Sequence, residues 1–237
     1  LDIAVVELSS FQLMDMKKSP AVAVVTNVSP NHLDKHTDMG EYVAAKEAIF
    51  AYQTASGLLV ANYDNEYTRG FLQKAKGRTL AFSDTAELPD GVYAKDGVVY
   101  YLGEPVLEEK DMILPGRHNV QNMMAAIGAT MGLAEPEHVR EVAETFSGVE
   151  HRLEFVRERN GVSYYNSSID SSPSRTVAAL SCFEKPVVLI AGGYDKHIPF
   201  EPMVEPVLSK VRHLILTGHT AGKIEQAVVS HPAYRPN

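Results

Sequence analysis

Lys46 occupies a position where a lysine is energetically costly. The sequence predicts a helix from Glu41 to Gln53. The apolar face of this helix consists of positions i, i+3, i+4 and i+7, which are Tyr42, Ala45, Lys46 and Ile49, so Lys46 lies on the apolar face. In one interpretation, the methylene stem packs against this face and the ammonium reaches water. In the other, Lys46 is an active-site amine at the ligand-binding edge of a parallel sheet. The spacing alone leaves both open.

Two further polar features are expected at the same sheet edge. Glu7 ends an apolar run that predicts a strand from Ile3 to Leu8, and the polar loop 27–34, which contains His32, follows a predicted strand from Ala21 to Thr26. In open α/β sheets ligands bind at the carboxyl ends of the strands. A solvated strand end and a structural loop histidine are the plainer interpretations of these two residues. Three polar signals at one edge make a binding site an equal alternative.

Asparagines mark the start of a second predicted helix, from Asn119 to Met131. Asn119 is a candidate N-cap, and Asn122 follows three residues later on the same side of the helix. An Asn side chain carries both a donor and an acceptor, which complements the edge of an adenine base. For Asn119 alone, ordinary capping is the preferred interpretation.

Lys196 follows a buried strand predicted from Val187 to Ala191 and a Gly192-Gly193 turn. A lysine there could bind a carboxylate or phosphate, or it could be an ordinary surface lysine in a turn. The later segment 218–224 has the glycines of a phosphate loop at the wrong spacing, and Ile224 stands where Ser or Thr should bind Mg²⁺. We interpret this segment as a strand-to-helix turn.

The order of predicted elements indicates an α/β fold. Strand and helix signals alternate in the first part, which predicts a mostly parallel central sheet with helices, and an Asp96-Gly97 pair between two β-rich runs predicts a small antiparallel hairpin. After Glu150 the pattern restarts, which predicts a second Rossmann-like α/β domain and a division into 1–149 and 150–237. The remaining predicted elements are strands at Gly57–Ala61, Thr79–Phe82, Ser163–Tyr165 and His213–Thr217, and helices at Glu66–Lys74, Pro136–Thr145, Ser174–Leu180, Pro202–Lys210 and Ala221–Val229.

Composition excludes several classes of protein. With 22 Lys and Arg against 30 Asp and Glu, the net charge of −8 argues against a nonspecific nucleic-acid binder. No apolar run approaches the length of a membrane span. The single cysteine, Cys182, fits a reducing compartment, so we expect a cytoplasmic protein. Because the chain starts inside a predicted strand and ends after a helix, we also expect it to be part of a longer protein.

Six segments occur in an order that is hard to obtain by chance. They are Glu7-Leu8-Ser9-Ser10-Phe11-Gln12-Leu13, Asn31-His32-Leu33-Asp34, Ala44-Ala45-Lys46, Leu114-Pro115-Gly116 with His118, Asn119 and Asn122, His151-Arg152-Leu153-Glu154, and Ala191-Gly192-Gly193 with Asp195 and Lys196. Together they resemble the Mur ligases of peptidoglycan precursor synthesis over almost the whole chain. The run 9–13 fits the D-glutamate-adding members better than those that add L-alanine or D-alanyl-D-alanine.

This resemblance implies roles for individual residues. Glu7, His32 and Lys46 would form a catalytic Mg²⁺ site, with Lys46 carbamylated so that it supplies an anionic oxygen, the ligand type that Mg²⁺ prefers. The implied ATP-binding residues are His118, Asn119 and Asn122 at the adenine, Arg152 at the phosphates, and Ser167. The implied substrate-binding residues are Ser9, Ser171 and Lys196, the last through a carboxylate of D-glutamate.

The resemblance also implies an activity, namely ATP-dependent, ADP-forming addition of D-glutamate to UDP-N-acetylmuramoyl-L-alanine through an acyl phosphate. Such an enzyme serves cell-wall synthesis, and with it cell shape and division. Residues 1–149 would be most of the central, ATP-binding domain without its phosphate-loop part. Residues 150–237 would be an incomplete carboxyl-terminal domain. We expect a monomer that binds neither membrane nor nucleic acid, and a piece that is inactive by itself.

Two departures from the family pattern keep alternatives open. Ser167 stands where the family pattern has an aspartate at the nucleotide, and the loss of that carboxylate would weaken an ATP contact unless Asp170 substitutes for it. The second departure is that the chain has no Gly-rich phosphate loop. A folylpolyglutamate synthase-like ligase shares the architecture and the modified lysine but matches the run 9–13 less well. A noncatalytic nucleotide-binding module descended from the ligases is the alternative that Ser167 suggests.

Overall fold

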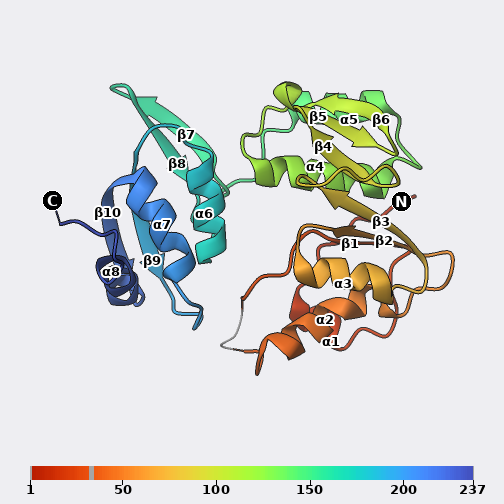
Figure 1. The fold of residues 1–237 in the computed structure, drawn as a ribbon, viewed down its shortest axis with the longest axis horizontal. Coiled ribbons are helices and arrows are strands. Elements are labelled where there is room, and N and C mark those ends of the chain that lie inside the picture. The colour runs from red at the N-terminus through yellow and green to blue at the C-terminus, as the bar shows by residue number, and fades with distance from the viewer. Residues whose placement is uncertain (1, 32–34, 237) are drawn as a thin grey trace. The chain divides into compact units, whose positions relative to one another are not determined.

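The computed structural model describes residues 2–31 and 35–236. The chain forms two compact units (Figure 1). Of the described residues, 2–28, 36–113 and 118–146 form the first unit, and 29–31, 35, 114–117 and 147–236 form the second. The assignment of residues 1–149 and 150–237 to two ligase domains stays a prediction.

The first unit is built on one six-stranded sheet. Its strands follow in spatial order as in the chain: β1 (Val22–Val25), β2 (Leu58–Asn62), β3 (Arg78–Ser83), β4 (Val92–Lys95), β5 (Val98–Tyr101) and β6 (Glu104–Glu108). The pairings from β1 to β4 are parallel, and those from β4 to β6 are antiparallel. The predicted mixed α/β fold with a mostly parallel sheet and a small antiparallel hairpin is confirmed.

The hairpin turn and an unpredicted second turn have the same backbone conformation. Asp96 and Gly97 both have positive φ, 50° and 78°, as a two-residue turn between twisted strands requires. Leu102 and Gly103 repeat this with φ of 51° and 85° and lead into β6. The second turn was missed because leucine rarely adopts positive φ and is no turn signal in a sequence.

Helices cover both faces of this sheet (Figure 1). On one face lie α2 (Met39–Ala51) and α3 (Glu66–Lys74), with α1 (Ser10–Met14) packed on α2, and on the other lie α4 (Arg117–Thr130) and α5 (Pro136–Thr145). Successive residues of β2 alternate accordingly, since Leu59 packs with Phe50 and Phe71 whereas Val60 packs with Met124. The short 3₁₀ helix η1 (Glu109–Asp111) follows β6.

The predicted strand Ile3–Leu8 is wrong. This stretch has no regular structure, and among the described residues β1 is the edge strand of the sheet. Val5 is 96% exposed, so its apolar side chain has no layer to pack on. An apolar run indicates strand tendency, but a strand forms only where a neighbour accepts its backbone hydrogen bonds.

The second unit contains a hairpin and a small parallel α/β layer. The hairpin joins β7 (Glu154–Arg159) to β8 (Val162–Asn166), and β9 (Val187–Gly193) pairs in parallel with β10 (Val211–Gly218). The helices are α6 (Pro173–Ser181), α7 (Glu201–Lys210) and α8 (Ala221–Val229). Its core includes Leu180, Met203 and Ile224. The unit is α/β as predicted, but in the described residues its parallel sheet has two strands, so it is not a full Rossmann domain.

In the described part of the chain, we find no helix with the length and apolar character needed to cross a membrane.

Candidate functional site

Lys46 lies on α2 in a partly desolvated position. Its side chain is half-buried, and its ammonium lies 5.9 Å from the centroid of the Tyr42 ring, one helical turn earlier. Burial lowers the pKa of Lys46, and the nearby negative charge of Glu7 partly opposes this by favouring the protonated form. The structure therefore brings Glu7 close enough to Lys46 for the two charges to interact, although Glu7 does not end a strand as the sequence analysis expected.

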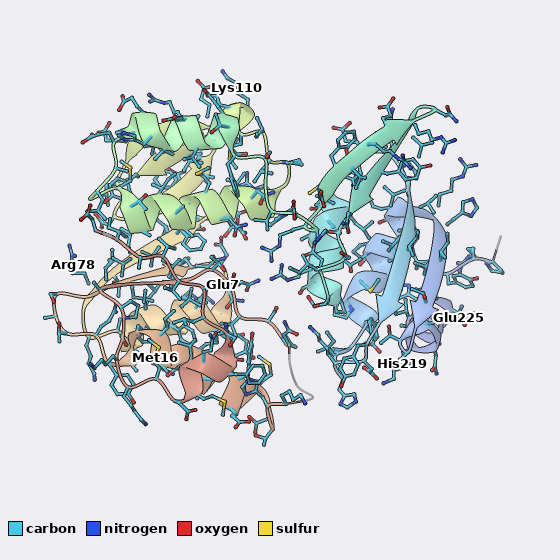
Figure 2. All side chains as sticks on the ribbon, turned by 180° about the vertical axis from the view of Figure 1, so that it is seen from behind. Glu7, Met16, Arg78, Lys110, His219 and Glu225 are labelled. Carbon is cyan, nitrogen blue, oxygen red and sulfur yellow. The ribbon has the colours of Figure 1, made fainter. Side chains whose placement is uncertain are left out.

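Glu7 lies in the irregular stretch before α1 (Figure 2). The helix after it is fixed by a capping box, in which the backbone N–H of Gln12 donates to Ser9 Oγ at 3.3 Å and the backbone N–H of Ser9 donates to Gln12 Oε1 at 2.9 Å. The structural role of the Ser9 hydroxyl is thus capping. Ser9 is exposed, as is Glu7 two residues earlier.

His32 lies outside the described residues, so its predicted place beside Glu7 and Lys46 stays a prediction. Among the residues that the structure does describe, three or more His, Cys, Asp or Glu side chains do not gather closely enough to hold a metal ion.

A buried histidine that sequence reasoning missed joins α1 to α2. His36 and Ser10 are only 3% and 2% exposed, and a hydrogen bond of 2.9 Å connects His36 Nε2 with Ser10 Oγ. The His36 ring stacks on Phe11 at 5.0 Å and contacts Tyr42, the ring beneath Lys46, at 5.2 Å. No local pattern could have found this pair, because its members are 26 residues apart.

The candidate adenine-binding residues lie on the first turns of α4. The helix begins at Arg117, so Asn119 is its third residue and the prediction that Asn119 is the N-cap is wrong. Gly116, with φ of 98°, ends the preceding loop and lets the helix start earlier. Asn122 Nδ2 lies 3.4 Å from Asn119 Oδ1, which confirms that the two amides share one side. His118 is half-buried in the same turn.

The second unit brings Ser167 together with Asp170. The Ser167 hydroxyl accepts from the backbone N–H of Leu153 at 3.0 Å and donates to Asp170 Oδ2 at 2.7 Å. Asp170, whose side chain is only 10% exposed, also has Arg175 Nη1 at 3.2 Å and Arg152 Nε at 3.8 Å from its Oδ1. A carboxylate therefore lies directly against Ser167 and beside the candidate phosphate-binding arginine.

Two candidate substrate-binding residues also meet in this unit. The Lys196 ammonium donates to Ser171 Oγ at 2.8 Å, although the residues are 25 positions apart. Lys196 follows β9, and Ser171 immediately precedes the N-cap of α6. Lys223, which sequence reasoning assigned to a mere turn, forms an ion pair with Asp195 next to them.

A cavity of about 530 Å³ in the second unit is lined in part by Lys223. It is lined by residues 198–201 together with side chains of α8 and the segment after it. Since no predicted site residue lines it, we do not place the candidate site there.

Comparisons with known proteins agree with this organisation. The family model described as the Mur ligase middle domain matches residues 1–130. The chain is 54% identical over 226 residues to the UDP-N-acetylmuramoylalanine--D-glutamate ligase of Clostridium novyi, covering 95% of this chain and 49% of that protein. The ligase of the same name from Acetivibrio thermocellus is 51% identical over 231 residues, which is 96% of this chain and 50% of that protein. The chain thus spans about half the length of these relatives.

Solved structures with the same fold are more distant in sequence. MurF from Acinetobacter baumannii superposes with a TM-score of 0.75 at 17% identity, over 89% of this chain and 49% of that one. UDP-N-acetylmuramate-alanine ligase MurC from Thermotoga maritima superposes with a TM-score of 0.64 at 20% identity, over 90% of this chain and 49% of that one. At these identities the likeness concerns the fold alone.

Proposed function

Since this chain belongs to the Mur ligase family, we propose that the protein it forms part of joins D-glutamate to UDP-N-acetylmuramoyl-L-alanine in peptidoglycan precursor synthesis. The relatives that are about half identical to it carry the name of that ligase. The run Ser9–Leu13 supports the D-glutamate-adding branch. We further propose that residues 1–149 belong to the ATP-binding domain and 150–237 to the carboxyl-terminal domain.

The proposed reaction forms an amide in two steps. The L-alanyl carboxylate of the nucleotide substrate first attacks the γ-phosphorus of ATP, which gives an acyl phosphate and ADP. The D-glutamate amine then attacks the acyl carbon, loses a proton, and displaces inorganic phosphate. Both steps concentrate negative charge on phosphoryl oxygens, so cationic groups at the site would stabilise them.

The partly desolvated Lys46 amine is the observation that carries this proposal. A carbamate forms when a neutral amine attacks CO₂ and releases a proton, so burial that lowers the pKa of Lys46 increases the reactive fraction. The product would replace a costly buried cation by an anion. An anion at this half-buried position beside Glu7 needs a bound cation, so the role of the carbamate depends on Mg²⁺.

The residues near Lys46 fit a magnesium ion by donor chemistry. A carbamate oxygen and the Glu7 carboxylate are hard oxygen donors of the kind that Mg²⁺ prefers. His32 would be a third ligand, on the strength of the family resemblance. When bound, Mg²⁺ would neutralise charge on the transferring phosphoryl group.

We assign nucleotide and substrate contacts to the remaining candidates. His118, Asn119 and Asn122 would contact adenine. Arg152 would bind phosphate, with Ser167 and the adjacent Asp170 completing the nucleotide contacts, supported by the hydrogen bond between these two side chains. Ser9 and Ser171 would contact substrate, and Lys196 would bind a carboxylate of D-glutamate. We propose a cytoplasmic monomer that acts without membrane or nucleic-acid partners.

The test is Lys46→Ala in the whole enzyme, assayed for ADP release with UDP-N-acetylmuramoyl-L-alanine and D-glutamate. We expect activity to fall by about three orders of magnitude, as for loss of a group that stabilises transition-state charge, with partial recovery when short carboxylic acids are added. Lys110→Ala, at an exposed lysine of the same unit, is the matched control. ¹³CO₂ labelling should give a carbamate signal in the wild type that Lys46→Ala lacks.

Wild-type turnover by Lys46→Ala would refute the carbamate role. Turnover of a folate with glutamate, but not of the nucleotide substrate, would instead support the folylpolyglutamate synthase-like alternative. Absence of turnover with either substrate pair in the whole wild-type protein would support a noncatalytic module.

A further inference from the structure

A cluster of four polar side chains in the second unit lies where β9 and β10 both end. Its members are Ser171, Asp195, Lys196 and Lys223. The two strands are parallel and in register to their last residues, with Gly192 opposite Thr217 and Gly193 opposite Gly218. Their carboxyl ends therefore lie at one edge, the position at which open α/β sheets bind ligands. Asp195 and Lys196 follow β9 directly, and Lys223 lies in the first turn of α8 after β10.

Glycines bring the start of α8 against the end of β9. A Cβ on Gly192 would lie 1.8 Å from the carbonyl oxygen of Thr217, and one on Gly218 would lie 2.8 Å from Gly193 Cα. The backbone N–H of Thr220 donates to the Gly193 carbonyl at 3.2 Å. His219 and Glu225 mark this turn and helix in Figure 2. The close approach of the two backbones sets the distance between Lys223 and Asp195.

The charges at this edge are unevenly matched. The Lys223 ammonium donates to Asp195 Oδ2, and the backbone N–H of His197 donates to Asp195 Oδ1 at 2.9 Å. The Asp195 carboxylate therefore points to α8. Lys196, its neighbour in the chain, donates to the neutral hydroxyl of Ser171. Among the described residues Lys196 has no carboxylate within ion-pair distance, so its positive charge is uncompensated.

We propose that Lys223 is a positioning residue for the amino-acid substrate: by pairing with Asp195 it keeps that carboxylate away from Lys196, so that Lys196 and Ser171 bind a carboxylate of the substrate. This inference rests on the proposed function, which assigns Lys196 to D-glutamate. Without Lys223, the Asp195 carboxylate would compete with the substrate for Lys196 and repel it. Hydrogen bonding from Lys223, which lowers the pKa of Asp195, is consistent with this ion pair.

The test measures KM and kcat of the whole enzyme for D-glutamate and for ATP. Lys223→Met should raise KM for D-glutamate about tenfold, the effect of one uncompensated charge at a partly exposed site, with kcat within about twofold and KM for ATP unchanged. Lys223→Arg should retain the wild-type values. Lys185→Met, at an exposed lysine of the same unit, is the matched control.

The decisive variant is Asp195→Asn/Lys223→Met. In this double variant no carboxylate at position 195 competes with the substrate for Lys196, so Lys223 is no longer required. The double variant should therefore recover a KM for D-glutamate close to the wild type. A purely structural role for Lys223 would leave the double variant as impaired as the single one, and that outcome would overturn the inference. An unchanged KM in Lys223→Met would overturn it as well.

Lys196→Met separates this inference from the function on which it rests. If Lys196→Met leaves the KM for D-glutamate unchanged, the assignment of Lys196 to the substrate is wrong. If Lys196→Met raises that KM strongly while Lys223→Met does not, the substrate assignment stands and the role of Lys223 is wrong.

Discussion

The hydrogen bond between Ser10 and His36 should contribute measurably to the stability of the first unit. Both side chains are almost fully buried and lie 2.9 Å apart. Ser10→Ala removes one partner and leaves the His36 Nε2 atom buried without its hydrogen bond, which costs about 1–3 kcal/mol. His36→Phe keeps an aromatic ring between Phe11 and Tyr42 but leaves the Ser10 hydroxyl buried without its hydrogen bond, which has a similar cost.

The double variant Ser10→Ala/His36→Phe distinguishes this hydrogen bond from general packing. Removing both polar partners leaves no unsatisfied group, so the double variant should be less destabilised than the sum of the single variants by about 1–2 kcal/mol. Ser56→Ala, which removes an exposed hydroxyl, should change stability by less than about 0.5 kcal/mol and serves as the control.

Urea unfolding followed by far-UV circular dichroism measures these differences. The chain has no Trp, so its 11 Tyr residues provide the second, fluorescence probe. With a slope of about 2 kcal/mol per molar urea, each single variant should lower the midpoint by about 0.5–1.5 M. Hydrogen exchange of α2 amides assigns the transition to the first unit, since the chain has two compact units. Strictly additive costs in the double variant would refute the coupling between Ser10 and His36.

Two further predictions concern stability. Gly192→Ala should destabilise the second unit by more than about 2 kcal/mol, because φ at this residue is 128° and the new Cβ would meet the Thr217 carbonyl oxygen, whereas Gly222→Ala in α8, where nothing lies near a Cβ, should be neutral or stabilising by up to about 1 kcal/mol. Thermal denaturation compares the two, and equal melting temperatures would contradict the steric account. Burial lowers the pKa of Lys46 below its ordinary 10.5, so between the folded pKa and 10.5 the unfolded chain binds more protons and stability rises with pH. Lys46→Met should accordingly be more stable than the unmodified wild type at neutral pH, and unfolding free energies should show that difference shrinking as pH rises towards 10.5; a difference independent of pH would argue against a desolvated amine.

Local signals predicted the elements whose stability is mostly local. The helices Glu66–Lys74 and Pro136–Thr145 begin and end at the predicted residues, because apolar periodicity and an N-terminal proline act within a single helix. The strand Ile3–Leu8 and the cap at Asn119 were wrong for the opposite reason. A strand depends on its neighbour in the sheet, and the start of α4 depends on the left-handed Gly116 before it.

By itself, the sequence determined the α/β class, the place of Lys46 on the apolar face of its helix, the run of motifs and the glycines of the β9 turn, all of which depend on residue type and spacing along the chain. Only the tertiary structure decided which side chains meet. Glu7 near Lys46, Ser10 against His36, Lys196 on Ser171 and Lys223 on Asp195 each join residues at least 25 positions apart. Such contacts arise from the packing of helices on sheets and the register of parallel strands, which no short stretch of sequence encodes.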